Sequence, residues 1–208
     1  MSNIDKELKD ILDEEQNSII KSNEKYIMVS ACPGAGKTYT IVRKIEKELE
    51  TIKDFQGIIA CSFSNEAANE LKSRIDKSID TSQSYIGTID SFVLKFIIGP
   101  FINRYLKEKG ELDEPVKINS IVFPENYYEI NMMTRLYDKS HDIRKHANEY
   151  CNAWMNKLKS GEYEISFPTY LLAAKIVKMK VFNEYFSDRY TSIYIDEAQD
   201  LNFFQHIL

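Results

Sequence analysis

The sequence has few cysteines and glycines and no long apolar segment. Its three cysteines, Cys32, Cys61 and Cys151, are odd in number and lack the spacing of a metal site, which favours reduced thiols. No run of about 18 apolar residues occurs, so the sequence predicts no membrane span. The N-terminal residues lack the apolar centre of a secretion signal. We also find no internal repeat or low-complexity tract, and we expect a cytoplasmic protein.

Positive charge is also in short supply. The 208 residues include 27 Lys and Arg against 32 Asp and Glu, a net charge of −5. This balance excludes a surface that is positively charged throughout, so any contact with nucleic acid must come from a local basic or polar patch. A hydrophobic fraction of 43% with 28% charged residues is typical of a soluble globular protein with one large or two small domains.

Short apolar runs alternate with helical patterns along much of the chain. The sequence predicts strands at Tyr26–Ser30, Gly57–Phe63, Tyr85–Thr88 and Ser192–Ile195. Three predicted helices follow the first three of these runs: Lys37–Ile52, one carrying Ala68, Leu71, Ile75 and Ile79, and Ser91–Ile98. Continuous apolar strands alternating with helices are typical of a buried parallel sheet. We therefore expect an α/β fold.

The residues between the third and fourth predicted strands have a different character. Their apolar spacing predicts a long helix with Trp154 and Leu158 on one face, and another with Leu172 and Phe186. Pro168 suits the first turn of the second helix. We expect an all-helical insertion at 99–188 and divide the sheet domain between residues 1–98 and 189–208.

A glycine-rich loop lies between the first predicted strand and the first helix. Its sequence, ACPGAGKT, departs from the phosphate-loop pattern G-x-x-x-x-G-K-[ST] only by alanine at the first position. Small residues let backbone N–H groups surround phosphates, and the helix N-terminus favours an anion. Lys37 would reach the β- and γ-phosphates, and the Thr38 hydroxyl would complete a Mg²⁺ site. The predicted nucleotide-binding residues here are Ala31, Cys32, Pro33, Gly34, Ala35, Gly36, Lys37 and Thr38.

The last predicted strand ends in two acidic residues within the sequence IYIDEAQD. Asp196 would hold Mg²⁺ through its waters, and Glu197 would orient and deprotonate the attacking water. An Asp-Glu pair after a strand can also be a helix cap followed by a first-turn acid. Beside a phosphate loop, the pair favours hydrolysis of a nucleoside triphosphate, ATP above all.

Four motifs in order carry a family resemblance. ACPGAGKT, SFSNEAANELKSRI, GTIDSF and IDEAQD resemble the motifs of superfamily 1 DNA helicases, in the UvrD/Rep/PcrA branch with its RecB- and AddA-type relatives. The resemblance covers residues 12–208. It implies a RecA-like subdomain 1A at 1–98 and 189–208, with 99–188 resembling subdomain 1B.

The resemblance also implies roles in nucleotide binding. Gln16 takes the place of a glutamine that recognises adenine, although Asp13-x-x-Gln16 also fits a capping box. Gln199 matches the residue that couples the γ-phosphate to DNA movement. Tyr39 stands where the branch often has arginine, so a role specific to that arginine does not carry over. We include Tyr39 among the nucleotide-binding positions.

The second and third motifs imply contacts with single-stranded DNA. In the second motif these fall on Phe63, Ser64, Asn65 and Ala67, and in the third on Thr88, Asp90 and Ser91. The alternatives are that Asn65 only caps its helix and that Phe63 belongs to the core. Tyr127, Tyr128 and Trp154 in the insertion could stack on bases, but aromatic residues at helical spacing are more often core.

These features together predict the N-terminal half of an ATP- and Mg²⁺-dependent 3′-to-5′ DNA helicase of the repair type. The sequence ends before the later motifs, and before the strand that in this family separates the phosphate-loop strand from the acidic strand. We therefore expect those two strands to lack their shared neighbour, and the chain alone to turn over little ATP. A second possibility is a nucleotide-binding regulatory or split-helicase subunit that works with a partner such as a nuclease. An unrelated phosphate-loop kinase or GTPase is disfavoured, since no guanine-reading N/T-K-x-D occurs.

Overall fold

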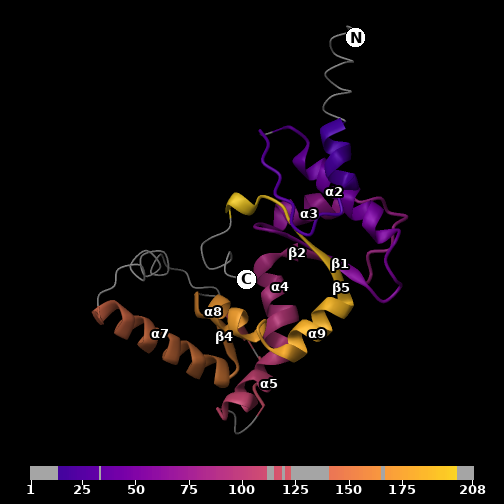
Figure 1. The fold of residues 1–208 in the computed structure, drawn as a ribbon. Helices are drawn as coiled ribbons and strands as arrows, with labels where there is room; N and C mark the ends of the chain where they lie inside the picture. The colour runs from indigo at the N-terminus through magenta and orange to yellow at the C-terminus, as the bar shows by residue number, and fades with distance from the viewer. Residues whose placement is uncertain are drawn as a thin grey trace, which may run out of the picture. The chain divides into compact units, whose positions relative to one another are not determined.

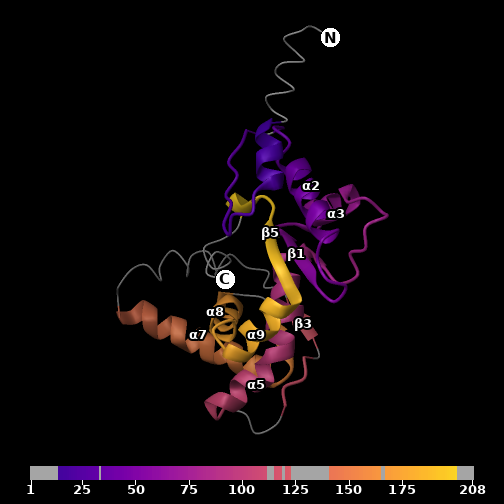
Figure 2. The same ribbon diagram turned by 45° about the vertical axis from the view of Figure 1, so that its right-hand side comes forward.

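The structure is a computed structural model that describes residues 14–32, 34–111, 115–118, 120–122, 141–164 and 167–200. The chain forms two compact units (Figures 1 and 2). The first unit includes the residues up to Thr88 together with Phe186–Asp200, and the second unit includes Ile89–Tyr185. The domain boundaries that the sequence suggested, after residues 98 and 188, stay a prediction. No described helix combines the length and the apolar character needed to cross a membrane.

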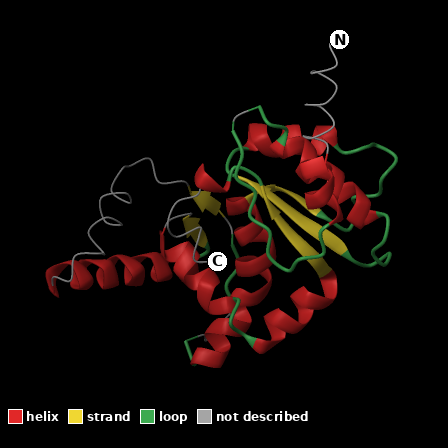
Figure 3. Ribbon diagram, turned by 45° about the horizontal axis from the view of Figure 1, so that its top comes forward, coloured by secondary structure: helices red, strands yellow, loops and turns green. Residues whose placement is uncertain are grey.

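A parallel sheet of three strands forms the centre of the first unit. Strands β1 (Gly57–Ser62), β2 (Tyr85–Thr88) and β5 (Tyr190–Ile195) lie in the order β2-β1-β5, seen as the three long arrows in Figure 3. In register, Ala60 lies opposite Ile86 on one side and Tyr194 on the other. All of β1 is buried, as expected for a strand covered on both faces. Three of the four predicted strands are thus confirmed.

The predicted strand at Tyr26–Ser30 is wrong. This segment has no strand structure, and Tyr26 and Met28 are 83% and 95% exposed. A strand exists only with a partner that takes up its backbone N–H and C=O groups. Among the described residues β5 pairs with β1 alone, so no shared neighbour joins the segment to the sheet.

Helices α2 (Lys37–Leu49) and α3 (Asn65–Arg74) pack on one face of the sheet. Val42 and Ile45 from α2 meet Leu71 from α3 in one cluster with Ile58 and Ala60 of β1. Each fully buried aliphatic side chain contributes about 1.5–3 kcal/mol to folding. Both predicted helices are confirmed, but α2 ends at Leu49 and α3 at Arg74, each sooner than predicted. Ile75 and Ile79, which were predicted to belong to α3, lie in the segment that follows it and pack against the same cluster.

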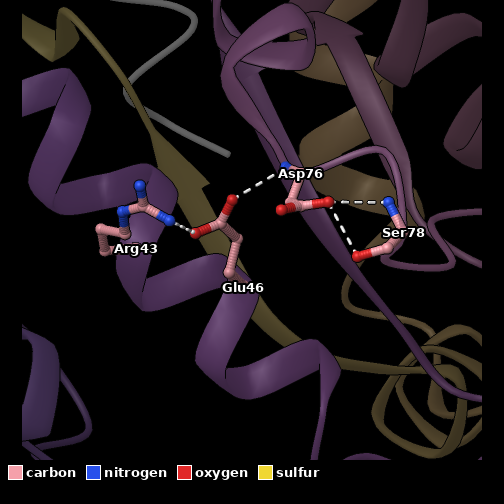
Figure 4. Close-up of polar contacts among 4 residues, drawn as sticks. All are labelled: Arg43, Glu46, Asp76 and Ser78. Atoms are coloured by element: carbon pink, nitrogen blue, oxygen red, sulfur yellow. Dashed lines mark hydrogen bonds and ion pairs between the residues drawn. The ribbon is translucent and has the colours of Figure 1, made fainter.

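A buried carboxylate joins α2 to the segment after α3 (Figure 4). Glu46 is almost fully buried; its Oε2 accepts from the Arg43 guanidinium at 2.7 Å and its Oε1 from the Asp76 backbone N–H at 2.8 Å. Asp76 in turn accepts from the Ser78 N–H and hydroxyl, which lowers the pKa of that carboxyl. The oxygens of Glu46 thus have donors from two elements.

The three cysteines are free thiols, as predicted. Cys61 is buried in β1, where loss of hydration raises the pKa of its thiol to about 12. Such a thiol stays protonated at neutral pH and behaves as a small apolar side chain. Cys61 is therefore a packing residue, whereas Cys32 is exposed in the phosphate loop.

The second unit begins with a continuous helical run of three parts. Helix α4 (Ile89–Phe92) leads into the π-helix Val93–Ile98 and then α5 (Gly99–Lys109). Pro100 lies in the first turn of α5, a position where proline is common. The unit also contains α7 (His141–Lys159), α8 (Phe167–Ile176) and most of α9 (Lys180–Arg189). Trp154 of α7 is buried, which confirms that it belongs to the core.

Two predictions for this unit are wrong. The insertion is not all-helical, because β3 (Ser120–Val122) and β4 (Glu162–Glu164) pair in parallel. Strands of three residues are too short to show a periodic pattern in the sequence. The apolar face from Leu172 to Phe186 belongs to two helices, α8 and α9, because the backbone tightens between them: Met179 N–H bonds Ile176 C=O at 2.9 Å. Pro168 does lie in the first turn of α8.

The Glu46 contacts predict a graded effect of substitution on stability. Glu46→Ala leaves the Asp76 N–H without its acceptor and should lower the free energy of unfolding by about 1–2 kcal/mol. Glu46→Gln keeps an oxygen for that N–H, and Arg43→Ala removes only a half-exposed partner, so each should cost less than about 1 kcal/mol. Urea unfolding measures the order. Equal losses in all three variants would contradict the assignment of the Asp76 contact as the important one.

Candidate nucleotide and DNA site

The phosphate loop turns into α2 through two glycines with left-handed backbone angles. Gly34 has φ 81° and Gly36 has φ 80°, a region that disfavours residues with a side chain. A Cβ on Gly36 would lie 2.7 Å from Nε2 of Gln16, but that atom ends a flexible side chain that can move aside, so the need for glycine here comes from the backbone angle. Pro33 lies outside the described residues. The described glycines of the motif thus have the angles that the phosphate-loop prediction requires.

Lys37, the first residue of α2, folds back over the loop. Its Nζ donates to the carbonyl of Ala31 at 3.1 Å and to that of Cys32 at 3.5 Å. The amine therefore lies among the loop carbonyls at the N-terminal end of a helix, where the helix dipole favours an anion. A phosphate entering the loop would meet this ammonium.

Gln16 lies beside the same loop. Its Nε2 donates to the carbonyl of Ala35 at 3.3 Å. The helical residues 14–21 that carry it are fixed to α2 by Lys44, whose Nζ donates to the carbonyls of Ile19 and Ser22 at 3.0 and 2.6 Å. Burial lowers the pKa of that ammonium. Asp13, the other half of the capping-box alternative, lies outside the described residues.

Asp196 meets the phosphate-loop helix directly. Its Oδ2 accepts from the Thr38 hydroxyl at 3.1 Å, and its Oδ1 from the Glu197 N–H at 3.1 Å. The residue is 5% exposed. This burial is the main reason that the pKa of the carboxyl is raised above its ordinary value, against the lowering effect of Thr38. Thr38 and Asp196, 158 residues apart, thus form one polar pair.

Glu197 has an unusual backbone for its residue type. Its φ of 53° is left-handed, a region that few non-glycine residues adopt and that often marks functional positions. The Gln199 side chain donates to Oε2 of Glu197. The predicted catalytic base therefore follows Asp196 directly in the chain and contacts the residue predicted to sense the γ-phosphate.

The second motif begins with an exposed aromatic residue and a helix cap. Phe63 is 51% exposed, so the alternative that it belongs to the core is wrong. The Ser64 hydroxyl caps α3 by accepting from the Ala67 N–H at 3.1 Å, so the alternative that Asn65 is the cap is also wrong. Asn65 is the first residue of α3, one position after the cap.

The residues of the third motif fall in both units. Thr88 ends β2, and its carbonyl accepts from the Tyr85 hydroxyl at 2.8 Å. Asp90 and Ser91 belong to α4 of the second unit, where Asp90 accepts a hydrogen bond from the Tyr170 hydroxyl of α8. Asp90 thus joins two helices of its own unit. Tyr127 and Tyr128 lie outside the described residues.

Several polar contacts of α2 could not be predicted from the sequence. Arg43 lies over the Tyr39 ring at 5.2 Å from its centroid, and Glu48 accepts from the hydroxyls of Thr191 and Tyr194 on β5. Burial together with that carboxylate raises the pKa of Tyr194. Thr191 is 143 residues away from Glu48, so no local pattern could reveal the pair.

The described residues fit a magnesium nucleotide better than a protein-only metal cage. Among them, no group of three or more His, Cys, Asp or Glu side chains could hold a metal ion. Mg²⁺ keeps several waters and takes one or two protein oxygens beside substrate phosphates. Thr38 and Asp196 supply such oxygens next to the glycine turn and Lys37.

A glycine turn, a helix and a buried aspartate at the end of a parallel strand lie together in a mixed α/β domain with a small parallel sheet. Residues 12–166 match the family described as the UvrD/REP helicase N-terminal domain, and the chain belongs to this family.

The chain is also similar to individual proteins. It is 31% identical to Gabija protein GajB of Bacillus cereus (strain VD045) over 174 residues. This alignment covers 84% of this chain and 31% of that protein. It is 32% identical to the ATP-dependent DNA helicase srs2 of Schizosaccharomyces pombe over 42% of this chain and 10% of that protein. The exonuclease/helicase subunit RexA of Lactococcus lactis subsp. cremoris is 29% identical over 39% of this chain and 8% of that protein. The chain thus spans less than a third of each relative.

The raised pKa of Asp196 predicts how stability depends on pH. Because the fold favours the protonated carboxyl, the ionised form destabilises it at every pH above the folded-state pKa, and this penalty disappears below the ordinary aspartate value. Asp196→Asn should therefore raise the melting temperature at neutral pH, by an amount that shrinks as the pH falls through that window. Thermal unfolding of both proteins from about pH 3.5 to 8 measures this; a constant difference would contradict it.

Proposed function

We propose that this chain is the N-terminal ATP-binding half of an ATP-dependent 3′-to-5′ DNA helicase or translocase. The observation that carries the proposal is the hydrogen bond from Thr38 to Asp196, because it brings the phosphate loop to the acidic motif. Family membership supports helicase function. The 3′-to-5′ polarity and single-stranded DNA as substrate rest on the motif resemblance.

The nucleotide would bind at the N-terminal end of α2. Gly34 and Gly36 have the backbone angles for N–H groups to face the phosphates, and Lys37 would exchange its loop carbonyls for the β- and γ-phosphates. Gln16, beside Ala35, would read the adenine edge through its amide. Tyr39 lies exposed one residue after Thr38 and offers its ring to the nucleotide.

Hydrolysis would use the acidic motif. Magnesium would neutralise phosphate charge, held by the Thr38 hydroxyl and the Asp196 carboxylate. Glu197 would orient the attacking water and accept its proton. Gln199, already bonded to Glu197, would exchange that contact for the γ-phosphate and so report whether it is present.

Single-stranded DNA would bind where β1 leads into α3. Phe63 is exposed and offers a face for base stacking, and the first turn of α3 carries Asn65 beside the helix N-terminus. Thr88 follows at the end of the neighbouring strand. These are local contacts, so a net charge of −5 does not oppose them.

A second candidate is a nucleotide-binding protein that works with a partner, for example a nuclease. The sheet edge favours it: β5 pairs on one side only among the described strands, and Ile193 and Ile195 are exposed there. An additional strand from a partner would cover this edge. Co-purification of a second polypeptide that is lost when Ile193 is changed to Asp would support this alternative.

Two substitutions should separate ATP binding from ATP hydrolysis in the full-length protein. Lys37→Ala should weaken ATP binding and abolish ATPase activity stimulated by single-stranded DNA, because the phosphates lose their ammonium. Glu197→Gln should keep ATP binding within about threefold and slow turnover by about 10²–10⁴-fold, the range for removal of a catalytic base. The control Glu108→Gln changes an exposed carboxylate of α5. Full activity in Glu197→Gln would overturn its role.

The exposed phenylalanines on either side of β1 allow a matched test of DNA binding. Phe63 and Phe55 are 51% and 56% exposed and lie beyond opposite ends of the strand. Phe63→Ala should weaken binding of fluorescent single-stranded oligonucleotides by about 1–3 kcal/mol, the contribution of one stacked base. Phe55→Ala should leave the affinity unchanged. Equal losses, or none in either variant, would rule out stacking at Phe63.

A further inference from the structure

Ser62 has a buried hydroxyl that lacks a hydrogen-bond partner among the residues that the structure describes. The residue is 1% exposed at the last position of β1. Leaving such a group unsatisfied lowers stability relative to an apolar replacement. An unpaired buried hydroxyl in a folded protein calls for an explanation, such as strain, a bound water or ion, or a role in catalysis.

The register of the sheet gives the neighbours of Ser62. Side chains two residues apart on a strand lie on the same face, so Ser62 shares the face of Ala60, which α2 and α3 cover. Ala60 lies opposite Tyr194, so Ser62 lies opposite Asp196, whose N–H bonds the carbonyl of Cys61 at 2.9 Å. Adjacent strands are about 4.8 Å apart. Ser62 and Asp196 therefore occupy neighbouring positions on the same face of the sheet.

Asp196 has room for another donor. Its two oxygens accept one bond each, from Thr38 and from the Glu197 N–H, whereas an ionised carboxylate can accept about four. A buried charge is tolerated only when it is well hydrogen-bonded. The Ser62 hydroxyl, opposite Asp196 in the register of the sheet, is a candidate for this additional bond.

We propose that Ser62 is a positioning residue of the magnesium-nucleotide site, whose hydroxyl donates to the Asp196 carboxylate when the magnesium nucleotide is bound. The inference rests on the proposed function, because it assumes that Asp196 serves the metal. It explains why a serine occupies a place where alanine would fit the surrounding apolar face. Ser62 acts through Asp196 and touches neither nucleotide nor water.

The test compares Ser62→Ala with Ser84→Ala in the full-length protein. The Ser84 hydroxyl accepts from the Ile58 N–H at the other end of β1, so its loss should lower the melting temperature and leave magnesium dependence unchanged. Ser62→Ala should do the opposite. Its melting temperature in EDTA should equal or exceed that of the wild type, and the gain in affinity for a fluorescent ATP analogue on adding Mg²⁺ should fall about tenfold, as for one hydrogen bond to a charged group. Ser62→Thr, which keeps the hydroxyl, should restore the gain.

The outcomes separate this inference from the proposed function. If the wild type binds the analogue and Ser62→Ala shows the same gain with Mg²⁺, the role of Ser62 is overturned and the proposed function stands. A fall in melting temperature for Ser62→Ala in EDTA that matches Ser84→Ala would also overturn it, since the hydroxyl would then have a structural partner. If the wild type binds no nucleotide, the proposed function itself fails.

Discussion

The hydrogen bond between Thr38 and Asp196 is the contact on which the site depends. It joins the first turn of α2 to the end of β5, and its geometry follows from the sheet, because Asp196 also donates its N–H to the carbonyl of Cys61 in β1. The pairing of β5 with β1 and the position of α2 together bring the phosphate loop to the acidic motif. A change in the pairing of β1 with β5 would move Asp196 away from Thr38.

Long polar side chains fix α2 to three other elements. Lys44 binds the carbonyls that end the helical residues 14–21, Glu48 binds hydroxyls of β5, and Glu46 binds the N–H of Asp76 after α3. These elements carry, in turn, the candidate adenine-reading glutamine, the acidic motif and the candidate DNA helix. The helix that follows the phosphate loop is thus connected to all three, which is what a nucleotide-driven motor would require of it.

The sequence predicted what local pattern encodes and missed what depends on distant partners. Strands β1, β2 and β5 and helix α2 were predicted because apolar period and glycine placement are properties of a single segment. Tyr26–Ser30 has the composition of a strand, yet pairing belongs to two segments and no described strand pairs with it. Asn65 was considered as a possible cap of α3, but Ser64 holds that position, and the bonds of Glu46 to Asp76 and of Glu48 to β5 had no local signal. Motif order placed the candidate site residues, but Ser62 emerged only from burial and register.

Three unfavourable features gather at the carboxyl end of the same sheet. Glu197 has a left-handed backbone, Asp196 is a buried acid with a raised pKa, and Ser62 has an unpaired hydroxyl. Each costs stability, and folding alone would favour an ordinary turn, an amide and an alanine in their place. A magnesium nucleotide would reverse at least two of these costs at once, because the cation favours the ionised carboxylate and the ionised carboxylate can accept from the hydroxyl. Their concentration at one edge is therefore better explained by a ligand than by the fold.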